Sequence, residues 1–382
     1  MIKIINVYMF SYYFPPQYSG AALQAISLAK KLRQRGVETT FLTVNHGGLP
    51  ETDEVEGFKI YRVLEGKGKF GEVLLWRNMW KLLWHHKIEF DIFHSHGAYL
   101  RNSIVGPLSK LMGKKSLLKV SLANNDLYGL GAGKSGWLHK LFILMVNRYV
   151  SISKEITSEL IGYGFPKKKI VEIHNGVDTD RFSPVNKEKM TLRKKYGLPE
   201  NGSMLLYVGV VDERKNVKWL IEEWNRISYN YQGFLVVVGP ISREDKGMRL
   251  YNSLKAYENK LKGKIFFIQY MDKIEDFYRM TDIFVLPSVN EGMPNVVLEA
   301  MSSGLPCLVN KVSGAEDIIN GENGLLFDVN IPDTFINGLL RLKDESERFK
   351  IGTKARQDIV NRFSLDHIAD EYIELYKEML KK

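Results

Sequence analysis

The chain has 382 residues, of which 45% are hydrophobic and 26% are charged, a balance typical of a soluble globular protein with about two domains. The single cysteine, Cys307, excludes an internal disulfide and fits a reducing compartment. We expect a cytoplasmic protein without a signal peptide, because the first residues run directly into a strand pattern and no apolar run reaches transmembrane length.

The formal charge of +10 is unevenly distributed along the chain. Residues 1–180 contain 24 Lys and Arg against 15 Asp and Glu, whereas the remainder contains 30 against 29. This asymmetry indicates that the first half faces an acidic partner: nucleic acid, a phosphorylated acceptor or an anionic membrane. The alternative is a solvated basic surface without a partner.

The chain begins with a strand, a loop, a helix and a second strand. The strand at 2–8 is followed by a loop containing Ser19 and Gly20, a helix at 21–35 and a strand at 37–44. This order predicts the first βαβ unit of a Rossmann-like sheet.

The next feature is a helix with tryptophans at every fourth position. Trp76, Trp80 and Trp84 recur at helical spacing, and basic residues flank them at 77, 81 and 87. Such a helix could lie in the interface of an anionic membrane. Alternatively, the same stripe packs on the sheet as part of the core.

Polar residues follow the next two predicted strands. His94 and His96 lie near the end of a strand at 91–97 and point the same way. No third ligand accompanies them, so the sequence predicts no metal site. Asn124 and Asp126 follow a strand at 117–122.

A second sheet begins at residues 203–208. Gly209 ends this strand, and Arg214 and Lys215 precede a helix at 217–228. Cations beside a helix N-terminus can neutralise a diphosphate. Tyr270 and Met271 follow a later strand, at 265–268, and either flank a nucleobase or fill space in the core.

The segment at 282–310 predicts a strand, a loop, a helix and a strand. Glu291 lies on the loop at the carboxyl end of the first strand, where α/β sheets bind ligands. Glu299 lies about two turns along the helix. Carboxylates accept hydrogen bonds from vicinal diols, and backbone N–H groups of the loop can bind hydroxyls or phosphates. This arrangement suits a sugar nucleotide.

Glu291 and Glu299, separated by seven residues, resemble the E-x7-E signature of the retaining glycosyltransferases of family 4. The segments that extend this resemblance are HNGVD at 174–178, VGVVDERKNV at 208–217, VVVGP at 236–240 and GAEDIINGENGLLF at 314–327. It implies the α/β GT-B fold, with two Rossmann-like domains whose parallel sheets face each other across a cleft. The expected acceptor-side domain is 1–182 with the final helix at 365–382, and the expected nucleotide-sugar domain is 183–364.

The resemblance also implies residue roles. Lys215 and Arg214 would stabilise the departing diphosphate, and Glu291 would hold the sugar. The implied donor-binding residues are Gly20, Gly209, Tyr270, Met271, Gly292, Met293, Pro294, Asn295, Val296 and Glu299, the last on the ribose. His96, Asn124 and Asp126 are the acceptor-side candidates. Two positions depart from the family pattern: Ala123 stands where many relatives carry His, and Val210 where an Arg usually follows the Gly.

The expected activity is transfer of a sugar from an NDP-sugar, with a UDP-sugar favoured, to the hydroxyl of a glycan or lipid-linked acceptor. Bacterial surface polysaccharide or glycolipid synthesis is the expected setting, in the cytoplasm or peripherally on the inner face of the membrane. No metal, other cofactor or nucleic acid is expected. Two alternatives stay open: a non-catalytic nucleotide-sugar-binding subunit and a GT-B sugar-nucleotide epimerase.

Overall fold

The computed structural model describes residues 4–17, 19–66, 71–127, 130, 136–184, 189–241, 245–261, 264–269, 271 and 273–381. Tyr270, one of the predicted nucleobase contacts, lies outside these residues. The chain divides into a first unit, Met1–Gly176 with Leu365–Lys382, and a second unit, Val177–Ser364. The division falls at Gly176, a few residues before the predicted boundary at 182. The final helix belongs to the first unit.

The first unit contains an eight-stranded sheet in the order β3-β4-β2-β1-β5-β6-β7-β8. Its strands are β1 (Ile5–Ser11), β2 (Val37–Val44), β3 (Thr52–Val55), β4 (Phe58–Val63), β5 (Ile92–His96), β6 (Lys115–Val120), β7 (Arg148–Ser151) and β8 (Ile170–Glu172). Every pairing is parallel except that of β3 with β4. The predicted Rossmann-like βαβ unit is therefore confirmed, whereas the antiparallel edge strand β3 was not predicted.

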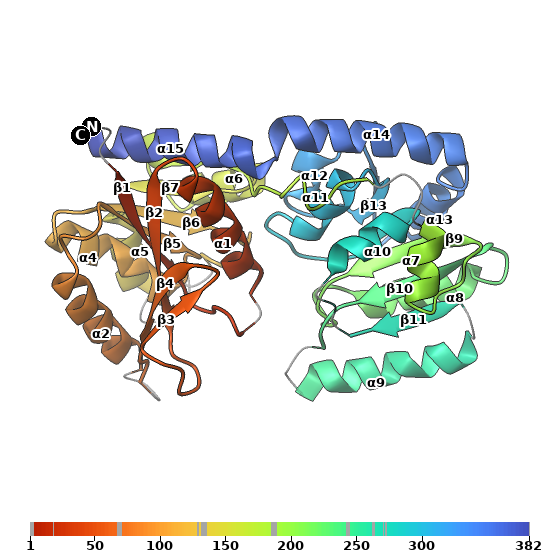
Figure 1. Cartoon of the computed structure of the whole chain (residues 1–382), viewed down its shortest axis with the longest axis horizontal. Helices are drawn as coiled ribbons and strands as arrows, with labels where there is room; N and C mark the ends of the chain where they lie inside the picture. The colour runs from red at the N-terminus through yellow and green to blue at the C-terminus, as the bar shows by residue number, and fades with distance from the viewer. Residues whose placement is uncertain are drawn as a thin grey trace. The chain divides into compact units, whose positions relative to one another are not determined.

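Helices cover both faces of this sheet (Figure 1). They are α1 (Gly20–Arg33), α2 (Gly71–His85), α3 (Leu100–Ser103), α4 (Val105–Leu111), α5 (Gly136–Leu144), α6 (Lys154–Gly162), the short 3-10 helix η3 (Lys167–Lys169) and α15 (Leu365–Lys381). Helices α1 and α15 pack together over one face, in a core that includes Met9, Leu32 and Tyr372. On the other face α2 contacts β4, and α4 contacts β5, β6 and α5. Sequence analysis assigns no element to 100–111, where α3 and α4 lie.

The second unit contains a six-stranded sheet in the order β11-β10-β9-β12-β13-β14, and all its pairings are parallel. The strands are β9 (Ser203–Val208), β10 (Gly233–Val238), β11 (Ile265–Ile268), β12 (Ile283–Leu286), β13 (Cys307–Asn310) and β14 (Leu325–Phe327). The helices are α7 (Lys189–Lys195), α8 (Val217–Ile227), α9 (Asp245–Lys260), α10 (Ile274–Met280), α11 (Asn295–Ser302), α12 (Ala315–Ile318), α13 (Pro332–Arg341) and α14 (Glu345–Arg362). Central strands β9, β10, β12 and β13 are buried almost throughout, as continuous apolar runs in a parallel sheet should be.

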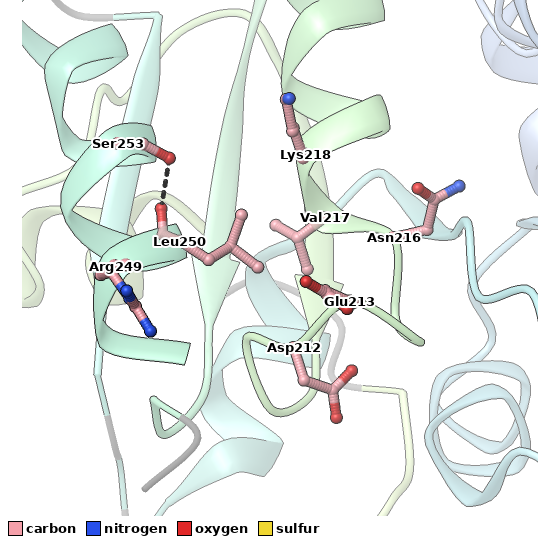
Figure 2. A pocket seen from close by; sticks show the side chains of 8 residues that line it. All are labelled: Asp212, Glu213, Asn216, Val217, Lys218, Arg249, Leu250 and Ser253. Carbon is pink, nitrogen blue, oxygen red and sulfur yellow. Dashed lines mark hydrogen bonds between the residues drawn. The ribbon is translucent and has the colours of Figure 1, made fainter. Parts of the chain in front are cut away.

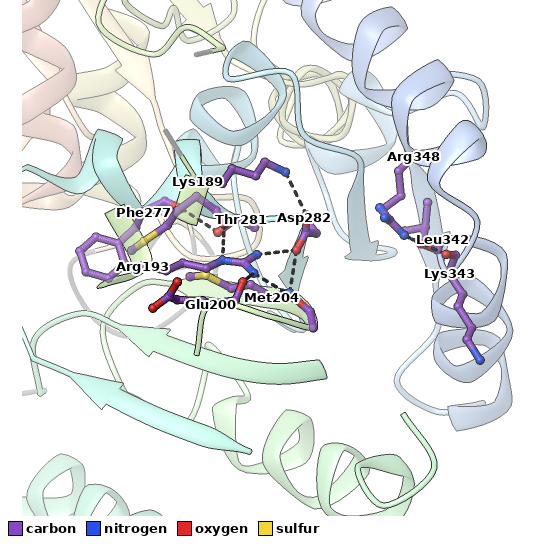
Figure 3. A network of polar contacts seen from close by, with 12 residues as sticks. Lys189, Arg193, Glu200, Met204, Phe277, Thr281, Asp282, Leu342, Lys343 and Arg348 are labelled. Atoms are coloured by element: carbon purple, nitrogen blue, oxygen red, sulfur yellow. Dashed lines mark hydrogen bonds and ion pairs between the residues drawn. The ribbon is translucent and has the colours of Figure 1, made fainter. Parts of the chain in front are cut away.

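A buried arginine connects α7 to this sheet (Figure 3). The Arg193 guanidinium donates to Asp282 Oδ2 at 2.6 Å and to the carbonyl oxygens of Met280, Glu200 and Gly202 at 3.0–3.2 Å. Asp282 also accepts from Lys189 Nζ at 2.9 Å and from the Met204 amide at 2.8 Å. Burial raises the pKa of Asp282, but these partners outweigh it and hold that pKa below its usual value. The network fixes α7 against the starts of β9 and β12.

Helix α2 carries the three tryptophans that were predicted either to lie in a membrane interface or to pack on the sheet. The structure supports neither alternative fully. The buried residues of α2 are Gly71, at the start of the helix, and Leu75, Met79 and Leu83, each of which directly precedes a tryptophan. Trp76 and Trp80 are partly buried, and Trp84 is exposed. The core-facing stripe is thus made by the smaller side chains, and the tryptophans lie at its edge. None of the helices in the described ranges has the length and apolar character needed to span a bilayer.

Candidate active site

The polar residues of the second unit gather at the carboxyl ends of β9 and β12, which are neighbours in the sheet. The loop after β9 carries Arg214 and Lys215, and the loop after β12 carries Glu291. Because the carboxyl ends of parallel strands lie at one edge, these two loops meet although Lys215 and Glu291 are 76 positions apart in the sequence. The structure therefore brings the three predicted catalytic residues together.

Glu291 forms ion pairs with both cations. Its Oε1 accepts from Lys215 Nζ at 2.6 Å, and its Oε2 accepts from Arg214 Nη1 at 3.3 Å. The Glu291 side chain is only 8% exposed and that of Lys215 only 13%, whereas the Arg214 side chain is 38% exposed. Charge-assisted hydrogen bonds in such a partly desolvated setting are strong. The Lys215–Glu291 pair is thus the rigid centre of the site, and Arg214 extends toward solvent.

Backbone contacts connect the two loops. The Val289 amide donates to the Arg214 carbonyl at 3.0 Å, and Arg214 Nη1 donates to the Asn290 carbonyl at 2.8 Å. Within the first loop, Asp212 Oδ1 accepts from the Lys215 amide at 2.8 Å. These bonds fix the ammonium group and the carboxylate relative to each other before any ligand binds, which is the preorganisation that electrostatic catalysis needs.

Glu299, the second carboxylate of the pattern, lies on α11 and contacts α10. Its Oε2 accepts from the Tyr278 hydroxyl at 2.7 Å. Burial raises the pKa of Glu299 to about 7, and the hydrogen bond from Tyr278 opposes this rise. Near neutral pH the Glu299 carboxyl is therefore present in two forms, a protonated form that donates a hydrogen bond and an ionised form that only accepts. Tyr278 is a site residue that sequence reasoning missed, since nothing in its helical segment distinguishes it from a core tyrosine.

The loop from Gly292 to Pro294 is buried and leads into α11, which begins at Asn295. Gly314, in the GAED segment, lies against this loop with φ +71°. A Cβ at Gly314 would lie 2.2 Å from the Gly292 carbonyl oxygen and 2.7 Å from Met293 Cα. Only glycine allows this approach, so Gly314 positions the loop that carries three of the predicted donor contacts, Gly292, Met293 and Pro294.

Gly209 marks the end of β9 with a similar close approach. Its amide donates to the Val238 carbonyl at 2.9 Å. A Cβ on the neighbouring Gly239 would lie 2.0 Å from the Gly209 carbonyl oxygen. The two glycines let the ends of β9 and β10 pass each other closely. The direct donor contact predicted for Gly209 stays a prediction.

A pocket of about 650 Å³ lies beside this site (Figure 2). Its lining combines the loop after β9 with α8 and α9: Asp212, Glu213, Asn216, Val217, Lys218, Arg249, Leu250 and Ser253. It shares a loop with Arg214 and Lys215 but is lined by none of the predicted side chains. Met271 is partly buried after β11, and its predicted nucleobase contact stays a prediction.

The acceptor-side candidates all lie in the first unit. His96 is buried at the end of β5 and stacks on His94, with ring centroids 4.4 Å apart, as their shared orientation predicts. Burial lowers the pKa of both imidazoles well below the usual value. The Asn124 side chain donates to Glu155 at 2.8 Å. Gly20 begins α1 after its N-cap Ser19.

Asp126 is 2% exposed, and its Oδ2 accepts from the Ser121 amide at 2.7 Å. Burial raises its pKa to about 6. This geometry stabilises the loop after β6 itself. The acceptor roles of His96, Asn124 and Asp126 stay predictions.

Lys119 is a further buried group that sequence analysis did not select. It pairs with His96 in the β5–β6 register, and its Nζ donates to Asn175 Oδ1 at 2.8 Å. Burial lowers the pKa of Lys119 to about 7. Lys119 lies in a mainly apolar strand, and nothing in the sequence pattern of that strand indicates that its ammonium group is buried. Within the described ranges, no group of three His, Cys, Asp or Glu side chains is placed to hold a metal ion.

The two units, each built on a mainly parallel sheet, have the architecture that the E-x7-E resemblance implies, and comparison with known proteins gives the family. Residues 18–181 match the family described as Glycosyltransferase Family 4, and residues 188–358 match Glycosyl transferases group 1. The chain belongs to this family of glycosyltransferases and has the GT-B fold, as the E-x7-E pattern predicted.

Three similar proteins illustrate the match. UDP-Gal:alpha-D-GlcNAc-diphosphoundecaprenol alpha-1,3-galactosyltransferase of Escherichia coli is 32% identical, over 79% of each chain. O-antigen biosynthesis glycosyltransferase WclY of Escherichia coli is 25% identical, over 78% of this chain and 82% of that protein. The structure of Anabaena Alr3699/HepE in complex with UDP and glucose superposes with a TM-score of 0.78 and 17% identity, over 98% of this chain and 100% of that one.

Proposed function

We propose that this glycosyltransferase moves a hexose from a UDP-sugar to the hydroxyl of a glycan or lipid-linked acceptor, with retention at the anomeric carbon. The observation that carries the proposal is the preorganised cluster of Lys215, Arg214 and Glu291 at the carboxyl ends of β9 and β12. Support for the donor comes from the UDP in the HepE structure and the UDP-Gal in the name of the galactosyltransferase. That name and the O-antigen role of WclY support a bacterial surface polysaccharide as the product.

In the proposed mechanism, the ammonium of Lys215 and the guanidinium of Arg214 bind the diphosphate and stabilise the charge that develops as it departs. Glu291 both positions Lys215 and accepts hydrogen bonds from sugar hydroxyls. Glu299 accepts from the ribose hydroxyls. Two side-chain cations replace a divalent ion in this scheme, so a chelator should leave the rate unchanged.

The experiment that tests the proposal is a thermal-shift screen of UDP-, GDP- and ADP-sugars, followed by a transfer assay with the donor that stabilises the protein. We expect a UDP-sugar to give the largest shift, and the product to keep the anomeric configuration of the donor by NMR. Donor binding without turnover, with acceptors present, would favour a non-catalytic subunit. Conversion of the free nucleotide sugar to an epimer would favour the epimerase.

Donor affinity should depend on pH through Glu299. Burial raises the pKa of Glu299 to about 7, so the protonated form predominates below that value in the free protein. If the carboxylate form accepts from the ribose, each pH unit below 7 should weaken binding by up to about tenfold. Titration calorimetry between about pH 5.5 and 8.5 would measure this. Glu299→Gln should bind more weakly and show no such slope; an equal slope in both proteins contradicts the assignment.

Substitution of Gly314 should displace the Gly292–Pro294 loop. In Gly314→Ala the added Cβ would overlap the Gly292 carbonyl, and overpacking of this kind costs about 1–3 kcal/mol. We expect a lower melting temperature and about tenfold weaker UDP-sugar binding. Gly321→Ala is the matched control, because Gly321 also has a positive φ, +87°, but open space around it. Equal loss of binding in both variants would show that backbone strain, not the loop contact, is responsible.

We also propose that the protein works in the cytoplasm at the inner face of an anionic membrane. The excess of basic residues in the first unit supports this. The expected contact through Trp76, Trp80 and Trp84 needs revision, because only Trp84 among them is exposed.

A further inference from the structure

The outer face of α5 is an apolar stripe that no element of the described chain covers. Trp137 is 69% exposed, Leu141 41% and Leu144 38%. These positions recur at helical spacing, and Lys140 lies exposed among them. The opposite face of α5 carries the buried residues Gly136, His139 and Ile143. Trp137, Leu141 and Leu144 therefore lie on the face of α5 that does not pack into the core.

Helix α2 lies beside α5 and presents a second stripe of the same kind. Trp76 of α2 contacts Phe142 of α5, with ring centroids 5.5 Å apart. The exposed residues of α2 and the turn after it are Val73, Leu74, Arg77, Lys81, Trp84, His85 and Ile88. Lys87 Nζ lies 3.9 Å from the centroid of the Trp84 ring, so its ammonium extends beside an exposed indole. We call the exposed residues of α2, its following turn and α5 the α2–α5 surface.

The charge along this surface is mainly positive. Residues 73–88 contain no Asp or Glu, and the two carboxylates that flank this stretch are paired, Glu72 with Arg101 and Glu89 with His86. Between residues 92 and 154 the only carboxylate is Asp126, which is buried, against nine Lys and Arg. A protein partner would need an extensive acidic surface to match it, whereas an anionic bilayer supplies both negative charge and an apolar layer.

We infer that the α2–α5 surface docks on an anionic lipid bilayer, with Trp84, Trp137, Leu141 and Leu144 entering the interface. Indole rings favour the headgroup level of a membrane, and lysines there keep their ammonium groups among anionic headgroups. Each basic side chain near such a surface adds to the attraction for the anionic headgroups. Docking places the first unit at the leaflet where a lipid-linked acceptor lies. It does not depend on the transfer chemistry of the second unit.

The test is flotation of the full-length protein with vesicles of phosphatidylcholine alone or mixed with phosphatidylglycerol. We expect binding to the mixed vesicles only, and loss of most of it between about 50 and 500 mM NaCl. Trp137→Ser/Leu141→Ser should lower the partition coefficient more than about tenfold, as should Lys81→Glu/Lys140→Glu. Phe349→Ser is the matched control: Phe349 is 76% exposed on α14 of the second unit and should have no effect.

Three results would overturn the inference: no binding of the wild type, equal binding to neutral vesicles, or wild-type binding by the Trp137/Leu141 variant. Both surface variants should keep the wild-type thermal shift with UDP, which shows that they fold. Lys215→Met should lose donor binding yet float like the wild type, so failure of the docking surface and failure of the proposed function give different results.

Discussion

Replacing Lys215 by methionine is expected to lower kcat by about 10²–10³-fold, because it removes from a partly desolvated site the ammonium that we propose stabilises the leaving diphosphate. Lys215 Nζ lies 2.6 Å from Glu291 Oε1 in the free protein. Its removal leaves the buried Glu291 carboxylate with Arg214 alone among these cations, at 3.3 Å. Because the buried Glu291 carboxylate has then lost one of its two cationic partners, the free energy of unfolding should also fall by about 1–3 kcal/mol. Steady-state kinetics and urea denaturation measure the two effects.

A double variant separates catalysis from folding. In Lys215→Met/Glu291→Gln the buried negative charge disappears together with its partner, so stability should recover toward that of the wild type. Activity should not recover, because no ammonium faces the diphosphate. If the double variant regains transfer activity, Lys215 acts only by neutralising Glu291, and its proposed role at the leaving group is wrong.

Replacing Arg193 by methionine is expected to lower the free energy of unfolding of the second unit by about 3–5 kcal/mol, since it removes one partner of a buried ion pair. The Arg193 side chain is 5% exposed and bonds to Asp282 and three backbone carbonyls (Figure 3). Methionine fills part of the space but satisfies none of these acceptors. Urea denaturation followed by circular dichroism measures the change.

Lys189→Met provides the comparison for Arg193. Lys189 contacts the same carboxylate, but its side chain is 47% exposed, so its loss should cost only about 0–1 kcal/mol. Equal effects of the two variants would show that the buried network contributes no more than a surface ion pair.

The architecture could be predicted from the sequence because its signals are local. Apolar runs predict most of the parallel strands of the two sheets, although not the polar edge strand β3. The E-x7-E pattern with its neighbouring segments gives the family. The meeting of Lys215 with Glu291 depends on the adjacency of β9 and β12, which strand patterns alone do not specify. The family resemblance supplied that information.

Other features could not be read from local patterns. On α2 the apolar positions form two adjacent stripes, Leu75–Met79–Leu83 and Trp76–Trp80–Trp84, and only packing decides that the smaller side chains face the sheet. Asp126 looks like a polar loop residue, yet it is buried and its carboxylate accepts a hydrogen bond from the Ser121 amide. Tyr278 and Lys119 lie in ordinary helix and strand patterns, and their significance comes from distant partners.

The central claim is that Lys215, Arg214, Glu291 and Glu299 converge on one UDP-sugar. Titration calorimetry of a UDP-hexose into the wild type and into Lys215→Met tests it most directly. Saturable one-to-one binding by the wild type, weakened at least about tenfold in the variant, is the predicted result. Equal affinities, or no binding by the wild type to any UDP-hexose, would contradict the account.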